Sequence, residues 1–179
     1  MKLRSGKGFT LIELLIVVAV IGTVAAIAVP GLLRARMAGN EASGVGSLRA
    51  INSGEAAFAS SCGQGGYATS LSQLFAPAPT RDQGFISPDL AIDTSTKSGY
   101  YIILSEGRNS TVVLGQAETC NDTGDALATY FARADPIEFE RTGLRHFGTD
   151  ERGSIFQDTS DTALTADTLL AAGTVTPLQ

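Results

Sequence analysis

The pattern of hydrophobic and polar positions divides the chain into three stretches. Residues 14–33 are twenty consecutive residues without a charge, followed by an Ala-rich stretch and then by short alternating runs. At about 1.5 Å per residue, a helix of this length spans about 30 Å, the thickness of one bilayer core. Lys2, Arg4 and Lys7 precede the run. We therefore expect one membrane-spanning helix, with its basic flank in the cytoplasm and the C-terminal bulk outside.

Two simpler interpretations of this run are an ordinary secretory signal peptide and a plain membrane anchor. The run is longer than a typical apolar signal region, and Arg34 and Arg36 follow it instead of a cleavage site of small residues. Glu13 argues against a plain anchor. A carboxylate inside an apolar helix costs about 3 kcal/mol near the bilayer centre, so it usually has a partner and a function.

The helical pattern continues through residues 34–60. Four large apolar side chains fall within about 80° of one another on a 100° wheel and predict one apolar stripe: Met37, Leu48, Ile51 and Phe58. Glu41 and Glu55 fall near this stripe and make the amphipathic pattern imperfect. Four glycines weaken an isolated helix by roughly 0.5–1 kcal/mol each, so a break near Gly44 is the alternative to a continuous helix.

Pro30 lies inside the apolar run. A proline in a helix interior costs about 3 kcal/mol in water, whereas in a membrane or a helix bundle the freed carbonyl finds other partners. We therefore expect the helix to kink at Pro30.

The chain after residue 60 predicts a small antiparallel sheet. Residues 61–99 are rich in proline and glycine, and they predict an irregular connection with one short helix at Ser70–Phe75. Residues 106–109 and 150–153 each predict a hairpin turn. The strand-like runs that these turns connect or flank are Tyr100–Leu104, Thr111–Leu114, Leu127–Ala132, Arg145–Phe147 and Ser154–Phe156.

Together these elements predict an α+β fold, in which a long N-terminal helix packs on a small antiparallel β-sheet head. The Thr- and Ala-rich tail is expected either to be poorly ordered or to drape over the surface. The expected segments are a leader at 1–8, the membrane helix at 9–33, its amphipathic continuation at 34–60, a connecting loop at 61–99, the sheet head at 100–158 and the tail at 159–179.

The composition suits one compact domain with one special segment, because the chain has 179 residues. The 20 glycines and the absence of tryptophan argue against a dense, enzyme-like core. The formal net charge is −5, and it becomes −8 if residues 1–8 are removed, leaving ten basic and eighteen acidic residues. A surface of that sign disfavours binding to phosphate backbones, so no nucleic acid partner is expected.

Cys62 and Cys120 are the two cysteines of the chain. An even number of cysteines in an exported chain favours a disulfide, and two free thiols are the alternative.

Catalytic chemistry is not expected. His146 is the single histidine, which excludes a paired-histidine zinc site, and the cysteines are not at metal-ligand spacing. No nucleophile elbow, P-loop or dinucleotide-binding glycine motif occurs, so no enzyme activity, cofactor or metal is predicted. Four acidic residues near the last hairpin carry oxygen ligands of the kind calcium prefers, but without EF-hand-like spacing, so a solvated loop is the favoured interpretation: Asp150, Glu151, Asp158 and Asp161.

The stretch Lys7-Gly8-Phe9-Thr10-Leu11-Ile12-Glu13 resembles the class III signal of type IV prepilins and type II secretion pseudopilins. The resemblance lies in a basic leader, a glycine, a phenylalanine, a glutamate four residues further on and an uncharged run in register. It covers about a third of the chain, since it extends to Pro30 and, more loosely, into the helix beyond. It implies that a prepilin peptidase, a membrane aspartyl protease, cleaves between Gly8 and Phe9 and methylates the new amine of Phe9.

The resemblance also implies that Glu13 pairs with the N-terminal amine of a neighbouring subunit during assembly. Gly22 and Pro30 are expected to bracket a stretch of helix that loosens in the filament. The fold expected from the family is the same α+β arrangement, and the resemblance adds that major pseudopilins bind calcium in a loop of the head.

The predicted function is that of a structural subunit of a type IV pilus-like filament. The chain would be a single-pass protein of the inner membrane before assembly and part of an extracellular filament afterwards, with an inner-membrane assembly platform as a further partner. One alternative is a pseudopilin of a type II secretion system. Alternatives of other classes are a membrane-tethered monomeric binding module, which leaves Glu13 without a purpose, and a periplasmic enzyme, which lacks a catalytic constellation.

Overall fold

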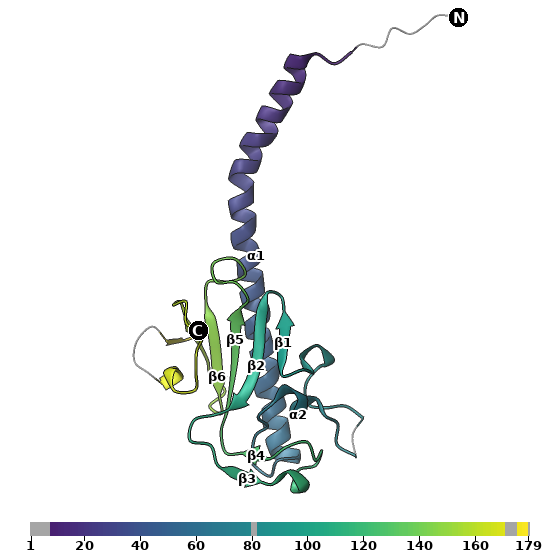
Figure 1. Ribbon diagram of the computed structural model, residues 1–179, viewed down its shortest axis with the longest axis vertical. Coiled ribbons are helices and arrows are strands. Elements are labelled where there is room, and N and C mark those ends of the chain that lie inside the picture. Colours follow the sequence, from purple (N-terminus) through teal and green to yellow (C-terminus); the bar gives the residue numbers. More distant parts are fainter. Residues whose placement is uncertain (1–7, 80–81, 171–174, 179) are drawn as a thin grey trace, which may run out of the picture. The chain divides into compact units, whose positions relative to one another are not determined.

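The computed structural model describes residues 8–79, 82–170 and 175–178, and the chain divides into two compact units, residues 1–36 and 37–179. Most of the basic leader, including Lys2, Arg4 and Lys7, lies outside the described residues. The first unit is formed by the N-terminal part of helix α1 (Leu11–Ser61), which is helical on both sides of Pro30. The second unit, called the head below, contains the rest of α1 and all the strands (Figure 1).

Helix α1 does not break near Gly44, and two of its glycines have a packing role. A Cβ atom at Gly44 would lie 3.4 Å from the Tyr100 ring and 3.5 Å from Ala134. At Gly54 it would lie 2.8 Å from Ile86 and 3.0 Å from the Phe85 carbonyl oxygen. The glycines that weaken the helix in isolation therefore let the head approach its backbone closely.

The main sheet lies on the part of α1 that belongs to the head (Figure 1). Its six strands are antiparallel and follow the order β1-β2-β5-β6-β7-β8. This confirms the predicted α+β fold. The strands are β1 (Thr94–Lys97), β2 (Tyr100–Glu106), β5 (Tyr130–Pro136), β6 (His146–Asp150), β7 (Ile155–Asp158) and β8 (Thr176–Pro177).

The predicted hairpin between Tyr100–Leu104 and Thr111–Leu114 is wrong. Strand β2 pairs with β1 and with β5, while β3 (Val112–Leu114) pairs with β4 (Ala126–Leu127) in a separate ribbon. The chain does turn near residue 107, but a turn signal does not determine the partner of the strand that precedes it. Pairing with β5 lets all seven residues of β2 join one ladder, which a three-residue strand cannot offer.

The predicted strand Leu127–Ala132 is also divided between two sheets, because residues 128 and 129 separate β4 from β5. These two residues bond to the chain before β3 instead. The Ala128 amide donates to the Thr111 carbonyl oxygen at 2.9 Å, and the Thr129 amide donates to the Ser110 hydroxyl at 3.3 Å.

The connection at 61–99 is more ordered than the sequence predicts. The expected short helix is present as α2 (Leu71–Phe75), with the Ser70 hydroxyl accepting the Gln73 amide. The connection also contains the short helix η1 (Pro88–Leu90) and strand β1, which we did not predict. A two-residue turn at Ser98 and Gly99, with φ of 48° and 76°, joins β1 to β2. Positive φ at both positions is typical of a tight hairpin turn.

The main core lies between α1 and the sheet. Leu48, Ile51 and Phe58 of the predicted stripe are fully buried, whereas Met37 is only half-buried. Tyr100, Ile102 and Leu104 face them from alternate positions of β2, as the period of a strand requires.

The described part of the tail drapes over the sheet. Leu164 and Leu169, the latter in the short helix η3 (Thr168–Leu170), pack with Phe131 in a second apolar cluster. Because neighbouring β5 residues point to opposite faces, Phe131 lies on the face away from α1. A Cβ atom at Gly148 would lie 3.0 Å from Leu169, so this glycine leaves room for the tail.

Candidate assembly site

The junction between Gly8 and Phe9 lies in exposed, non-helical backbone. Helix α1 begins only at Leu11, and Phe9 is 83% exposed. Apart from the chain neighbours of Gly8, no described residue has a heavy atom within 4 Å of a Cβ built at Gly8. Exposed backbone outside regular structure is the kind that proteases cut. The structure thus leaves the predicted cleavage position accessible.

Thr10 and Glu13 form a capping box at the start of α1. The Thr10 amide and hydroxyl donate to Glu13 Oε2 at 3.0 Å and 2.7 Å, and the Glu13 amide donates back to the Thr10 hydroxyl at 3.3 Å. This reciprocal arrangement satisfies amides that a helix N-terminus otherwise leaves free. Glu13 therefore stabilises the start of its own helix.

Sequence reasoning missed the part played by Thr10. The signal was present, because Thr-x-x-Glu directly before an apolar run is the capping-box pattern. Within the described residues, Glu13 Oε1 accepts no hydrogen bond, since all the bonds to this carboxylate go to Oε2. The capping box thus leaves one carboxylate oxygen available to a further donor.

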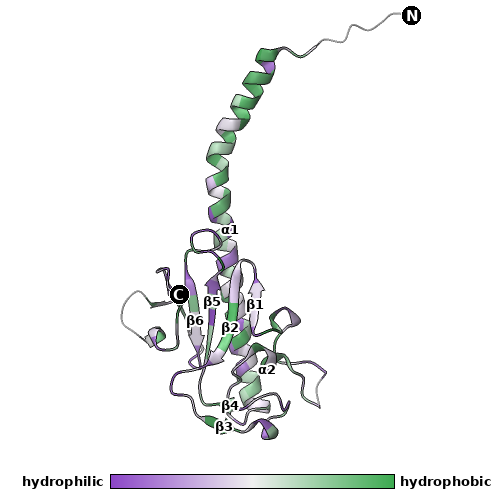
Figure 2. Cartoon of the chain, viewed as in Figure 1, coloured by the Kyte–Doolittle hydropathy of each residue, from purple (hydrophilic) through white to green (hydrophobic). Residues whose placement is uncertain are grey.

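The first part of α1 is predominantly hydrophobic along its length (Figure 2). Its large apolar side chains from Leu11 to Leu33 are between 48% and 82% exposed, and it is long and apolar enough to cross a membrane. An exposed apolar surface of this extent marks an interaction with a membrane or another protein. Gly22 and Pro30 lie within this segment, and a kink there stays a prediction.

Glu41, which disturbs the predicted stripe, is buried and paired. Its carboxylate accepts the Leu144 amide at 2.8 Å and the Arg145 guanidinium at 2.9 Å and 2.5 Å. Removing one partner of a buried ion pair strongly destabilises the folded protein, because the other charge stays buried without compensation. The pair therefore fastens the chain before β6 to α1.

Glu55 is fully buried, and no described residue pairs with it as a cation. Its Oε2 accepts the Ala68 amide at 2.9 Å, whereas Oε1 has no hydrogen-bond partner among the described residues. Burial raises the pKa of the Glu55 carboxyl well above its ordinary value, and the bond from Ala68 opposes this only in part.

A disulfide joins Cys62, directly after α1, to Cys120. The two Cα atoms are 4.7 Å apart, and the bond connects positions 58 residues apart in the sequence. The end of the helix is thereby tied to the segment that follows η2 (Gln116–Glu118).

The polar clusters of the head are engaged in local contacts. His146 Nδ1 lies 2.8 Å from Asp135, and the ring stacks on Phe139. Asp150 pairs with Arg152, and Asp158 accepts the amide and the hydroxyl of Ser160. In the described parts of the chain, no group of three or more His, Cys, Asp or Glu side chains is arranged to hold a metal ion.

Comparisons with known proteins concern the N-terminal region. Residues 3–29 match a family model described as the prokaryotic N-terminal methylation motif. A stretch of 39 residues is 56% identical to the type IV wide pilus major component PilA4 of Thermus thermophilus. The N-terminal region of the chain is similar to that of type IV pilins.

The methylation motif spans the Gly8–Phe9 junction, the capping box and the apolar side chains as far as residue 29. The match to the Thermus protein covers 22% of this chain and 30% of the relative. No solved structure matches the chain.

Proposed function

We propose that this chain is a structural subunit of a type IV pilus-like extracellular filament, assembled from the inner membrane through the first part of α1. The observation that carries the proposal is the continuous apolar surface from Leu11 to Leu33, which begins beside a capped carboxylate and has no cover among the described residues. The bilayer covers this surface before assembly. Neighbouring copies of the same helix cover it in the filament.

Processing prepares the subunit for assembly. A prepilin peptidase cleaves between Gly8 and Phe9 and methylates the new amine, which retains its positive charge. Phe9 becomes the first residue, one position before the capping residue Thr10. The cut removes Lys2, Arg4 and Lys7 and so removes the basic leader that would otherwise have to enter the apolar filament core.

Glu13 sets the axial register between neighbouring subunits. A charge in apolar surroundings costs several kcal/mol unless it is paired, and both Glu13 and the Phe9 amine face this cost. The amine of a neighbouring subunit pairs with Glu13, with Oε1 as the oxygen that the capping box leaves available. The apolar side chains supply cohesion without direction, and the charge pair fixes the axial position. A pseudopilin of a type II secretion system would use these residues in the same roles.

Analysis of sheared filaments tests the proposal. Filaments sheared from cells should contain a chain that begins at methylated Phe9, as read by N-terminal mass analysis. Gly8→Leu should leave a longer precursor in the membrane fraction. The proposal fails if the full chain stays with the membrane as a monomer, or if its terminus is Met1 or lies beyond Leu33.

A further inference from the structure

The loop between β5 and β6, residues 137–145, is a rigid turn at one end of the head. The Arg141 and Thr142 amides donate to the Glu138 carbonyl oxygen at 3.1 Å and 2.9 Å, and the Glu140 amide donates to the Gly143 carbonyl oxygen at 2.9 Å. Asn40 of α1 donates to the Thr142 carbonyl oxygen at 2.9 Å. With the Glu41–Arg145 pair, these bonds fix the loop to the helix.

Glu140 is exposed at this turn in an unusual conformation. Its φ is 63°, in the left-handed region that glycine adopts without steric cost. Its side chain forms no ion pair or hydrogen bond with any described residue, whereas the nearby Glu138 pairs with Arg141. The Glu140 carboxylate is therefore presented to solvent without a partner among the described residues.

Glu140 borders a shallow depression with both charged and apolar walls. The exposed Leu144 and the half-buried Phe139 supply the apolar part, and the Glu41–Arg145 pair also lines it. A free carboxylate beside apolar surface suits an arginine, because the guanidinium binds the carboxylate while the aliphatic stem covers the apolar side chains.

The first unit carries two exposed cations without ion-pair partners among the described residues. Arg34 and Arg36 are the only basic residues between Phe9 and Met37, both are exposed, and neither forms an ion pair among the described residues. Residues 37–179 hold eight basic and seventeen acidic residues, so neighbouring heads repel one another. Contact between these arginines and an acidic part of the next head relieves that repulsion.

We infer that the depression at residues 137–145 receives Arg34 or Arg36 of a neighbouring copy in the filament, with Glu140 as the carboxylate that binds it. The inference rests on the proposed filament function. It adds a second contact between subunits, distinct from the pairing of Glu13. An arginine and a glutamate at an interface determine which arrangement of neighbours is favourable more than they add to affinity.

Charge reversal in the full-length chain tests this contact. Glu140→Arg should lower the yield of sheared filaments at least about tenfold, without changing cleavage at Gly8 or the amount of subunit in the membrane. Combining it with Arg34→Glu and Arg36→Glu should restore most of that yield. Glu140→Gly removes the carboxylate while keeping a favourable backbone, so it should also lower the yield without destabilising the head.

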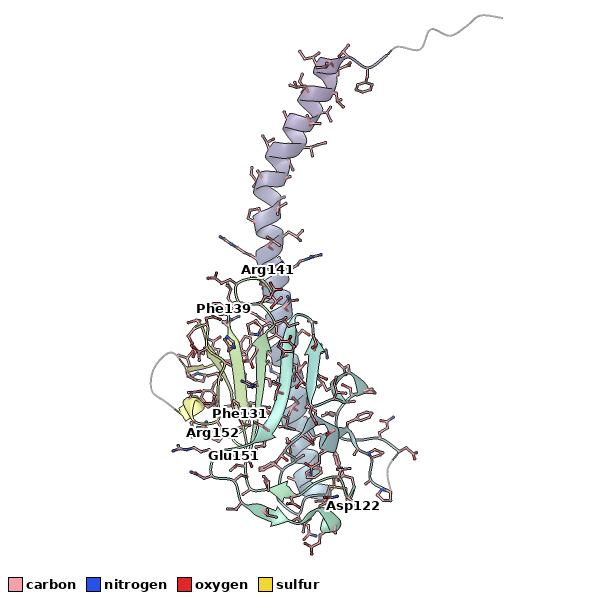
Figure 3. All side chains as sticks on the ribbon, viewed as in Figure 1. Asp122, Phe131, Phe139, Arg141, Glu151 and Arg152 are labelled. Atoms are coloured by element: carbon pink, nitrogen blue, oxygen red, sulfur yellow. A yellow bond between two sulfur atoms is a disulfide. The ribbon has the colours of Figure 1, made fainter. Side chains whose placement is uncertain are left out.

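Asp122 offers a matched control. It is exposed, has a φ of 48°, and lies at the other end of the head from Phe139 and Arg141 (Figure 3). Asp122→Arg should leave the filament yield unchanged. A loss equal to that of Glu140→Arg would show a general charge effect and overturn the inference.

Cross-linking provides a direct readout. Glu140→Cys combined with Arg36→Cys, or with Arg34→Cys, should give covalent multimers when filaments are treated with a bis-maleimide, which spans the two long side chains of an arginine–glutamate contact where a disulfide would be too short. Cys62 and Cys120 do not react, because they are already joined. Glu106→Cys with the same partners should not give multimers. If the wild-type chain forms filaments and the paired cysteine variants assemble to the same extent without covalent multimers, the contact is refuted and the filament function stands. Absence of wild-type filaments would refute the filament function itself.

Discussion

The two units of this chain differ in how far they bury similar apolar side chains. Leu14 and Ile16 in the first unit are 60% and 55% exposed, whereas Leu48 and Ile51, on the same helix within the head, are fully buried. Composition alone does not separate these two groups. The difference lies in what the chain supplies as cover, because the head brings a sheet and loops onto its part of α1 and no described residue covers the first unit.

The apolar surface of the first unit resembles a hydrophobic core that lacks covering elements among the described residues. Burial of apolar area stabilises by about 25 cal/mol per Å², whether the cover comes from the same chain, a membrane or another subunit. The head is therefore expected to be stable in a monomer. The first unit is expected to be stable only when a membrane or another subunit covers its apolar surface.

The largest expected effect breaks assembly while sparing the head. Glu13→Ala should insert in the membrane and be cleaved at Gly8, yet it should give few or no sheared filaments, because the register charge is lost. Glu13→Gln keeps the shape without the charge and should fail similarly. The measurement compares filament yield with precursor processing on immunoblots.

Thr10→Val separates the two roles of Glu13. It removes the hydroxyl of the capping box and retains the carboxylate, at a cost to the helix of about 1 kcal/mol. Filament yield should fall far less than with Glu13→Ala. Equal losses would assign Glu13 to helix capping, and a normal yield with Glu13→Ala would exclude the charge pair altogether.

The next effect concerns the head alone. Reducing the disulfide between Cys62 and Cys120 should destabilise the head by about 4 kcal/mol, from the chain-entropy estimate for a loop of 58 residues. Thermal unfolding of the detergent-solubilised chain with and without reductant measures the change. An unchanged melting temperature, with reduction verified by thiol labelling, would contradict the prediction.

A smaller effect concerns the buried carboxyl of Glu55. Because burial raises the pKa of Glu55 in the folded head, the folded state holds this proton more tightly than the unfolded chain does. Its contribution to stability is complete below the ordinary pKa of a glutamate and is lost as the pH rises toward the folded pKa. Glu55→Gln should therefore melt at the same temperature as the wild type near pH 4.

At neutral pH the same variant should be more stable than the wild type by on the order of 1 kcal/mol. Melting curves across this pH range test both expectations. Ser53→Ala, at an exposed position of the same helix, is the control and should follow the wild type at every pH. A pH dependence that persists in Glu55→Gln would assign it to another group.

The sequence predicted the helices and most strands because their signals are local. The uncharged run, the stripe at Leu48, Ile51 and Phe58, and the turn at 150–153 depend only on neighbouring residues. Strand β1 escaped prediction, since Thr94–Lys97 is polar and acquires its strand structure from pairing with β2. The sequence predicted the wrong pairing partner for β2 for the same reason, because pairing between distant segments leaves no local signal.

Burial of the carboxylates was equally hidden from the sequence. Glu41 and Glu55 both disturb the apolar stripe, but one finds Arg145 at a distance of 104 residues and the other finds only a backbone amide. The wheel places both on the buried face and does not show what meets them there. At the N-terminus, by contrast, every residue of the assembly site is contiguous, which is why a short motif sufficed to locate it.

The bond between Cys62 and Cys120 has a mechanical consequence. In the proposed filament, tension would enter a subunit through its N-terminal helix and meet the covalent bridge directly after that helix ends. Force that pulls on the two chain ends passes across the sulfur atoms, so residues 63–119 cannot be drawn out. At roughly 3.5 Å per residue, the bridge withholds about 200 Å of chain from extension. The bridge would therefore limit how far a subunit under load can extend. The chain after Cys120, which holds more than half of the described strands, could still unfold and lengthen.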